Sequence, residues 1–207
     1  MISTFNTLAS QESINKTTCS LEANGFHSEV VENKADALVK IKTLILEGAS
    51  VHNGSSTTLA EIGFIDYLKS GAHKWKNLHA NILAEADPKK QEQLRRESAF
   101  SEYYLGSAHA LSETGELVIA SNTGSQLPHL VFTSPNIILV VGTQKITPTL
   151  ADALRRLEEY VVPLEDKRAL SAYGVHTMNA KTLIMRKENP MLGRNVKIIL
   201  VKERLGF

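Results

Sequence analysis

The apolar run NIILVVG, at positions 136–142, restricts the fold more than any other part of this sequence. It is continuously apolar and lacks the polar alternation of a strand with one exposed face. A strand of this kind is buried on both faces, which is typical of parallel sheets covered by helices on each side. We therefore expect an α/β fold, in which a mainly parallel sheet is layered between flanking helices.

The rest of the chain alternates between strand and helix patterns, as such a fold requires. The expected strands lie at residues 27–32, 49–52, 107–113, 116–121, 181–187 and 195–203. The expected helices lie at residues 34–48, 58–71, 149–162 and 163–174. The charged segment that follows Asp87-Pro88, residues 89–106, predicts a solvated surface helix, because its acidic and basic residues interleave.

The length of 207 residues fits one domain, or one domain with a small appendage. We expect residues 1–30 to form an N-terminal helical extension and residues 31–207 to form a single α/β domain. The net charge of +1 indicates no steering toward nucleic acid or an acidic membrane. The first residues do not resemble a secretory signal and no apolar run could span a bilayer, so a cytoplasmic location is expected.

Cysteine and histidine usage argues against a metal or cluster held by this chain alone. Cys19 is the single cysteine, which excludes an intramolecular disulfide and a cluster held by several thiolates of one chain. The seven histidines show neither HxxxH nor HxH spacing. We therefore expect no metal and no cofactor.

The first candidate binding segment is a turn between an expected strand and an expected helix. Glycine permits an unusual backbone there, and small hydroxyl residues open the helix. Such a turn directs amide groups and the positive end of the helix at one point, which suits a phosphate or a carboxylate. The alternative is that the hydroxyl groups only cap the helix. The candidate residues are Asn53, Gly54, Ser55, Ser56 and Thr57.

Two further loops follow expected strands. In open parallel sheets ligands bind beyond the carboxyl ends of the strands, so the loop after the buried strand places an amide and a cation near such a site. The other loop offers hydrogen-bonding groups to a polar ligand. For both, the alternative is an ordinary solvated loop. The candidates are Thr123, Gly124, Ser125 and Gln126 in one loop, and Gln144 and Lys145 in the other.

Candidate catalytic groups are Glu113, Glu116 and Lys145. The two glutamates flank a tight turn, and a buried carboxylate there could transfer a proton. The alternative is a pair of exposed carboxylates, since charged residues are rarely buried without a reason.

The segments GSSTTLAEIGFIDYL, ETGELVIASNTGSQLPH, VVGTQKITPTLADALRRLEEYVVPLEDKRA and VKIILVKERLGF resemble the lactate-utilisation (LUD) domain family, over roughly residues 30–207. The resemblance implies a fold like the NagB, ribose-5-phosphate isomerase and CoA-transferase group. In those enzymes a Gly-Ser/Thr turn after a strand holds a phosphate or an oxyanion, which supports residues 54–57 as a binding turn. Glu116 departs from the small or hydroxyl residue of lactate-operon members, which puts its acid/base role in doubt.

The resemblance implies a protein that binds a small carboxylate or phosphorylated metabolite, as an accessory component of lactate or organic-acid utilisation. Two alternatives stay open: a stand-alone sugar-phosphate isomerase or CoA-transferase-like enzyme, and a non-catalytic interaction subunit. The expected partner is a small anionic metabolite, with no nucleic acid and no membrane. Self-association into a homo-oligomer, or partner subunits that carry iron–sulfur clusters, would fit the same resemblance.

Overall fold

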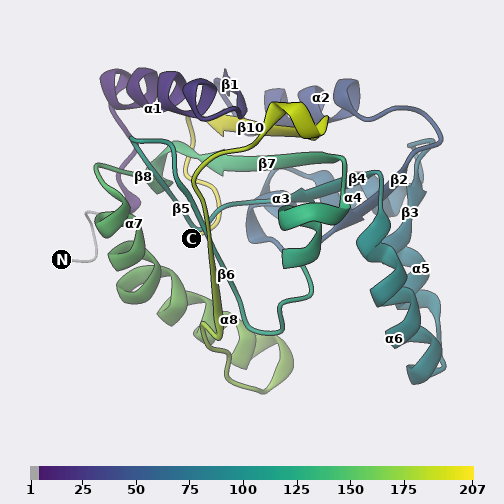
Figure 1. Ribbon diagram of the computed structural model, residues 1–207. Helices are drawn as coiled ribbons and strands as arrows, with labels where there is room; N and C mark the ends of the chain where they lie inside the picture. Colours follow the sequence, from purple (N-terminus) through teal and green to yellow (C-terminus); the bar gives the residue numbers. More distant parts are fainter. Residues whose placement is uncertain (1–4) are drawn as a thin grey trace.

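The computed structural model describes residues 5–207 and contains a sheet of six parallel strands. Figure 1 shows how this sheet lies among the helices. Residues 1–4 lie outside the described part of the chain. All pairings between neighbouring strands of this sheet are parallel. Across the sheet the strands are β1 (His27–Val31), β10 (Asn195–Val201), β7 (Asn136–Gly142), β4 (Tyr103–Gly106), β2 (Ser50–Asn53) and β3 (Lys76–Asn77).

Strand β7 lies between β10 and β4 and is buried on both faces. Ile138 and Val140 belong to the hydrophobic cluster on one face of the sheet. Ile137, Leu139 and Val141 belong to the cluster on the other face. Alternate side chains of a strand point to opposite faces, so a strand covered on both sides needs an uninterrupted apolar run. The predicted α/β fold with a mainly parallel sheet is confirmed.

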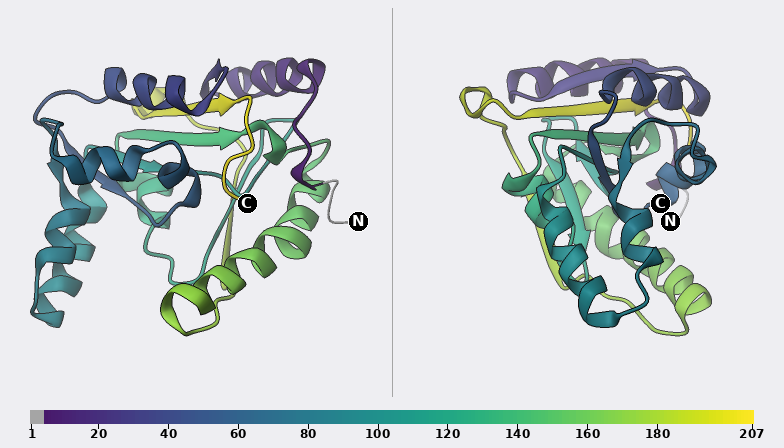
Figure 2. Two further views of the ribbon diagram at one scale, coloured as in Figure 1. Left: turned by 180° about the vertical axis from the view of Figure 1, so that it is seen from behind. Right: turned by 90° about the vertical axis from the view of Figure 1, so that its right-hand side faces the viewer.

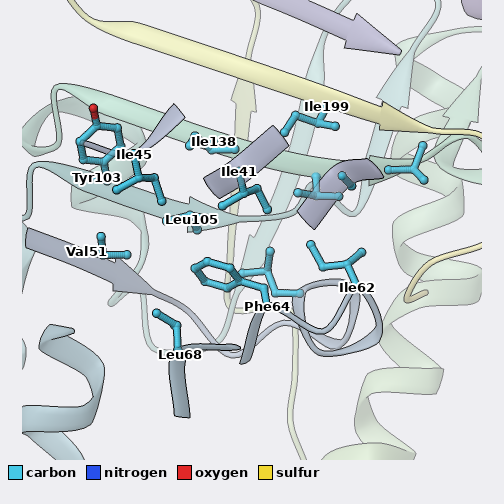
Figure 3. Packing of buried hydrophobic residues seen from close by; sticks show 14 of the residues in the cluster. Ile41, Ile45, Val51, Ile62, Phe64, Leu68, Tyr103, Leu105, Ile138 and Ile199 are labelled. Atoms are coloured by element: carbon cyan, nitrogen blue, oxygen red, sulfur yellow. The ribbon is translucent and has the colours of Figure 1, made fainter. Parts of the chain in front are cut away.

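Helices cover the first face of the large sheet. They are α2 (Lys34–Leu44), α3 (Thr57–Glu61) and α4 (Phe64–Ser70). Figure 3 shows Ile41 and Phe64 directed at Leu105 and Ile138 of the strands beneath them. Burying an aliphatic or aromatic side chain of this size contributes about 1.5–3 kcal/mol, so this layer supplies much of the stability that positions β2 and α3.

A second, smaller sheet and helix α1 (Gln11–Ala23) cover the other face. Strands β5 and β6 of this sheet are antiparallel neighbours joined by a tight turn. The four strands, in order across the sheet, are β8 (Ile146–Thr147), β5 (Ala110–Ser112), β6 (Leu117–Ser121) and β9 (Lys181–Met185). Figure 2 shows the smaller sheet beside the large one, with α1 and α2 along the outside of β1 and β10.

A long helical segment packs on the far side of the smaller sheet. It runs without a break through α7 (Leu150–Arg156), a π-helical turn η5 (Leu157–Val161) and α8 (Val162–Tyr173). At the β3 edge of the large sheet α5 and α6 project outward (Figure 1). The remaining elements are α5 (Leu78–Ala84), α6 (Pro88–Glu97), η2 (Ser98–Phe100), η3 (His129–Thr133), η4 (Thr143–Lys145) and η6 (Pro190–Leu192).

Three local predictions were wrong. The helix expected through residue 106 ends at Glu97, and β4 follows as a fully buried strand between β2 and β7. The single helix expected over residues 58–71 is broken at Gly63, whose φ of 78° is left-handed. The helix expected to end at Gly48 ends at Leu44, and its cap Ile45 is extended.

The proposed division between residues 30 and 31 stays a prediction, and β1 runs across that boundary. Helix α1 is docked by Ile14 and Leu21, which are both buried. Within residues 5–207 no helix combines the length and the apolar character needed to cross a membrane.

Candidate functional site

A cavity of about 280 Å³ lies where the carboxyl ends of β2, β4 and β7 meet the smaller sheet and α8. This is the edge at which open parallel sheets hold their ligands. The structure brings together most of the residues predicted as ligand-binding. Those that line the cavity are Gly54, Ser55, Ser56, Thr57, Thr123, Ser125, Gln126 and Lys145. Their role in binding stays a prediction.

The turn after β2 is held closely against β4. A Cβ atom at Gly54 would lie only 2.8 Å from the hydroxyl oxygen of Tyr104, so the turn needs glycine there. The backbone of Gly54 also hydrogen-bonds that hydroxyl group. The Ser56 hydroxyl accepts the amide of Leu59 and caps α3. Ser56 therefore both caps α3 and lines the cavity. The Gly54 amide already has a hydrogen-bond partner, the hydroxyl group of Tyr104.

The loop after β6 reaches the same turn. The same Cβ position at Gly54 is 3.4 Å from Oε1 of Gln126, and the Nε2 of Gln126 donates to the carbonyl of Ala120 at 2.9 Å. Thr123 Oγ1 donates to Ser125 Oγ at 3.1 Å, which orders the outer part of the loop. The two segments, far apart in sequence, therefore form adjoining walls of one cavity.

Lys145 follows β7 and is the buried cation of the cavity, with 3% of its surface exposed. Its Nζ donates to three neutral oxygens: Thr58 Oγ1 at 3.0 Å, Ser107 Oγ at 3.1 Å and the carbonyl of Ala108 at 3.2 Å. Within residues 5–207 no carboxylate forms an ion pair with it. Burial, reinforced by the charge of Arg156, lowers the pKa of Lys145 to about 7.

A second buried cation, Arg156 of α7, lies behind the cavity and is fully buried. It donates to the backbone carbonyls of Phe5 and His109, and burial lowers its pKa to about 10. His109 itself lines the cavity. Its Nδ1 accepts the amide of Ala120 at 3.1 Å, so its proton sits on Nε2. Burial, then the charges of Lys145 and Arg156, lower the pKa of His109 to about 3, so the ring is neutral at pH 7.

Three predicted binding residues do not line the cavity. Gln144 is buried and donates to the carbonyl of Leu205 at 2.9 Å, so it holds the C-terminal segment in place. Asn53 is buried behind the turn, where its Nδ2 donates to the carbonyl of Gly54. Gly124 packs against the side chain of Lys181.

Glu113 and Glu116 lie away from the cavity, on the β5–β6 turn. Glu113 accepts hydrogen bonds from Ser13 at 2.7 Å and Lys16 at 2.9 Å, which lower its pKa. Glu116 accepts bonds from Ser112 and Thr114, which lower its pKa as well. Both carboxylates are thus ionised and satisfied locally, and an acid/base role for either stays an untested prediction.

Sequence reasoning missed several residues of the cavity. Tyr104 and Ser107 were overlooked because β4 was not recognised as a strand. Glu165 and Arg168 of α8 line the outer wall and form a two-bonded ion pair, both bonds at 2.7 Å. Leu157 and Val161, which also line the wall, belong to the π-helical turn, and such turns occur often at functional sites.

Metal binding finds no support in the part of the chain that the structure describes. No group of three or more His, Cys, Asp or Glu side chains there is placed to hold an ion. The single cysteine, Cys19, is exposed.

Comparisons with known proteins agree with this architecture. The family model described as LUD domain matches residues 14–201. A crystal structure of a DUF162 family protein from Deinococcus radiodurans is similar over 94% of this chain and 99% of that chain, with a TM-score of 0.57 and 12% sequence identity. At that identity the likeness concerns the fold alone. No curated protein matches the sequence.

Proposed function

This chain belongs to the LUD domain family, and on that premise we propose that its cavity binds a small anionic metabolite, either a carboxylate or a phosphorylated compound. The observation that carries the proposal is Lys145, a buried lysine that lines the cavity and has only neutral hydrogen-bond partners. Burying a charge without a counter-charge costs several kcal/mol, roughly, unless something compensates it. A ligand anion supplies that compensation.

The surroundings of Lys145 support an anion rather than a neutral ligand. Arg156 adds a second buried positive charge nearby. Glu165 is the carboxylate that lines the cavity, and Arg168 already neutralises it. Ser55 and Thr57 add polar groups to the lining of the cavity. The two buried charged side chains at the cavity, Lys145 and Arg156, are therefore both cationic, and the size of the cavity suits a small metabolite.

The family's link with lactate utilisation extends this proposal to an accessory role in organic-acid metabolism. In that role partner subunits would supply the iron–sulfur clusters, because one cysteine cannot hold a cluster. A cytoplasmic location belongs to the same proposal.

The two alternatives have less support. A CoA-transferase-like or isomerase reaction needs a free buried carboxylate beside the substrate, whereas Glu165 is held by Arg168. A purely structural subunit is expected to have a filled pocket, whereas this cavity measures about 280 Å³. Both alternatives stay predictions.

A thermal-shift series with charge-matched ligands tests the proposal. The probes are propanoate and inorganic phosphate, with propanamide as the uncharged control and sodium chloride at equal ionic strength. At about 100 times its Kd an anion should stabilise the fold by roughly 2.7 kcal/mol. That corresponds to a rise in Tm of about 5–10 °C for a domain of this size. If no anion shifts the Tm, or propanamide shifts it as much as propanoate, the proposal is wrong.

A further inference from the structure

The three bonds of the Lys145 amine leave its protonation state open to change. A lysine held by a carboxylate is locked as an ammonium ion, but all three acceptors here are neutral oxygens. Of these, the carbonyl of Ala108 is the most distant, at 3.2 Å. A neutral amine has two N–H groups, so loss of the proton releases one acceptor and frees the nitrogen lone pair.

The charged groups around Lys145 favour that neutral amine. Arg156 of α7 opposes the positive charge, and Glu61 of α3 supports it. The Glu61 carboxylate is engaged elsewhere, since it accepts the amide of Gly206 at 2.7 Å. Burial, together with the charge of Arg156, outweighs the effect of Glu61 and lowers the pKa of Lys145 to about 7. Lysines that are desolvated or beside another cation are the ones that act as nucleophiles toward carbonyl groups.

The cavity also offers groups that fit the two ends of a small oxo acid. Ser55 and Thr57 line it next to Thr58, whose Oγ1 is 3.0 Å from the Lys145 amine. A carboxylate held near Ser55 and Thr57 would therefore place its neighbouring carbon toward the amine. The Nε2–H of His109 has no protein acceptor within residues 5–207, and His109 lines the same cavity, so it is free to donate to a carbonyl oxygen.

We infer that Lys145 forms an imine with a 2-oxo acid bound in this cavity; the inference rests on the proposed anion-binding function. The neutral amine attacks the carbonyl carbon, and the carbonyl oxygen takes up the two amine protons and leaves as water. The product is a carbon–nitrogen double bond, with no oxidant or reductant consumed. Protonation of the imine restores a positive charge beside the carboxylate, as the ammonium ion provided before.

Reductive trapping tests the inference on the full chain. The protein is incubated with pyruvate, the simplest ketonic 2-oxo acid, and sodium cyanoborohydride, which reduces an iminium ion to a stable secondary amine. Peptide mapping by mass spectrometry then locates the adduct. We expect Lys145 to be modified at least about tenfold more than any surface lysine, since its amine is the activated one. Excess propanoate should suppress this modification, because it occupies the same site and has no carbonyl group.

The outcomes separate the two proposals. If propanoate raises the Tm but the adducts are spread evenly over surface lysines, the imine is excluded while anion binding stands. If propanoate, pyruvate and inorganic phosphate all leave the Tm unchanged and Lys145 stays unmodified, both proposals fail. Mapping on the unaltered chain makes the result independent of whether a Lys145 variant folds. Lys16→Met serves as a matched lysine control, and its trapping pattern at Lys145 should be unchanged.

Discussion

Two lysines of the molecule have opposite surroundings: Lys145 at the cavity, and Lys16 of α1, which contacts Glu113 of the β5–β6 turn. Lys16 is exposed and pairs with Glu113, which raises the pKa of that lysine. Lys145 is buried without a carboxylate partner, and its pKa falls to about 7. The exposed charge of Lys16 is paired with a carboxylate, whereas a buried charge without such a partner lowers the stability of the fold. Such a cost points to a ligand.

Replacing Lys145 with methionine should give the largest effect. Loss of the charged donor is expected to weaken propanoate binding by roughly 10–100-fold, since hydrogen bonds to charged groups are worth about 1.5–3 kcal/mol. The Tm without ligand should not fall, because methionine fills the same volume without a buried charge. Calorimetric titration and thermal denaturation measure the two quantities. Lys16→Met is the control and should bind propanoate as the unaltered chain does; equal losses in both variants would remove the distinction.

Gly54→Ala should come next, at about 1–3 kcal/mol of unfolding free energy, because its Cβ would meet the Tyr104 hydroxyl at 2.8 Å. Tyr104 cannot move aside easily, since it is buried and its ring stacks on His129 at 4.5 Å. Adding Tyr104→Phe removes the oxygen, and the nearest ring carbon is then 3.9 Å away. A denaturant-melt double-mutant cycle should therefore show Gly54→Ala costing less when combined with Tyr104→Phe than alone. Additive losses would contradict this packing.

The pH dependence of binding distinguishes the two regions without any substitution. Lys145 is charged below its pKa of about 7, so propanoate affinity should be full at pH 6 and fall as the pH rises through 7. The expected loss is about tenfold between pH 6 and pH 8. Glu113 and Glu116, with lowered pKa values, and His109, at about 3, keep their charge states across this range. A flat affinity profile would show that the Lys145 charge does not take part.

The smallest effect on stability is expected from a substitution in the β5–β6 turn. Glu113→Gln should lower the unfolding free energy by about 0.2–1 kcal/mol, the usual value of an exposed ion pair, and this loss should shrink at high salt. Propanoate affinity should not change, since Glu113 does not line the cavity. Urea denaturation with a parallel binding titration checks both statements. A loss of affinity would instead connect the turn to the site.

The parts of the fold and of the site that could be predicted are those that depend on neighbouring residues in the sequence. The run at 136–142 could be predicted as a buried strand because it is apolar without a break. Lys145 could be predicted as a candidate site residue because it comes directly after that strand. Strand β4 is short and comes after a charged helix, so its central place depends on pairing with β2 and β7. Gln144 and Lys145 look equivalent in sequence. The difference between them is the hydrogen bond from Gln144 to the carbonyl of Leu205, a residue far away in the sequence, which holds the Gln144 side chain outside the cavity lining.

The order of strands in the large sheet has a consequence during synthesis on the ribosome. Lys145 emerges before β10, although β10 separates β7 from β1 in the finished sheet. The Leu205 carbonyl, which accepts Thr58 and Gln144, emerges later still. The nascent chain therefore contains every cation of the cavity before it contains the strand and the carbonyl group that complete the cavity. A metabolite would therefore meet a completed cavity only after β10 and Leu205 have been synthesised.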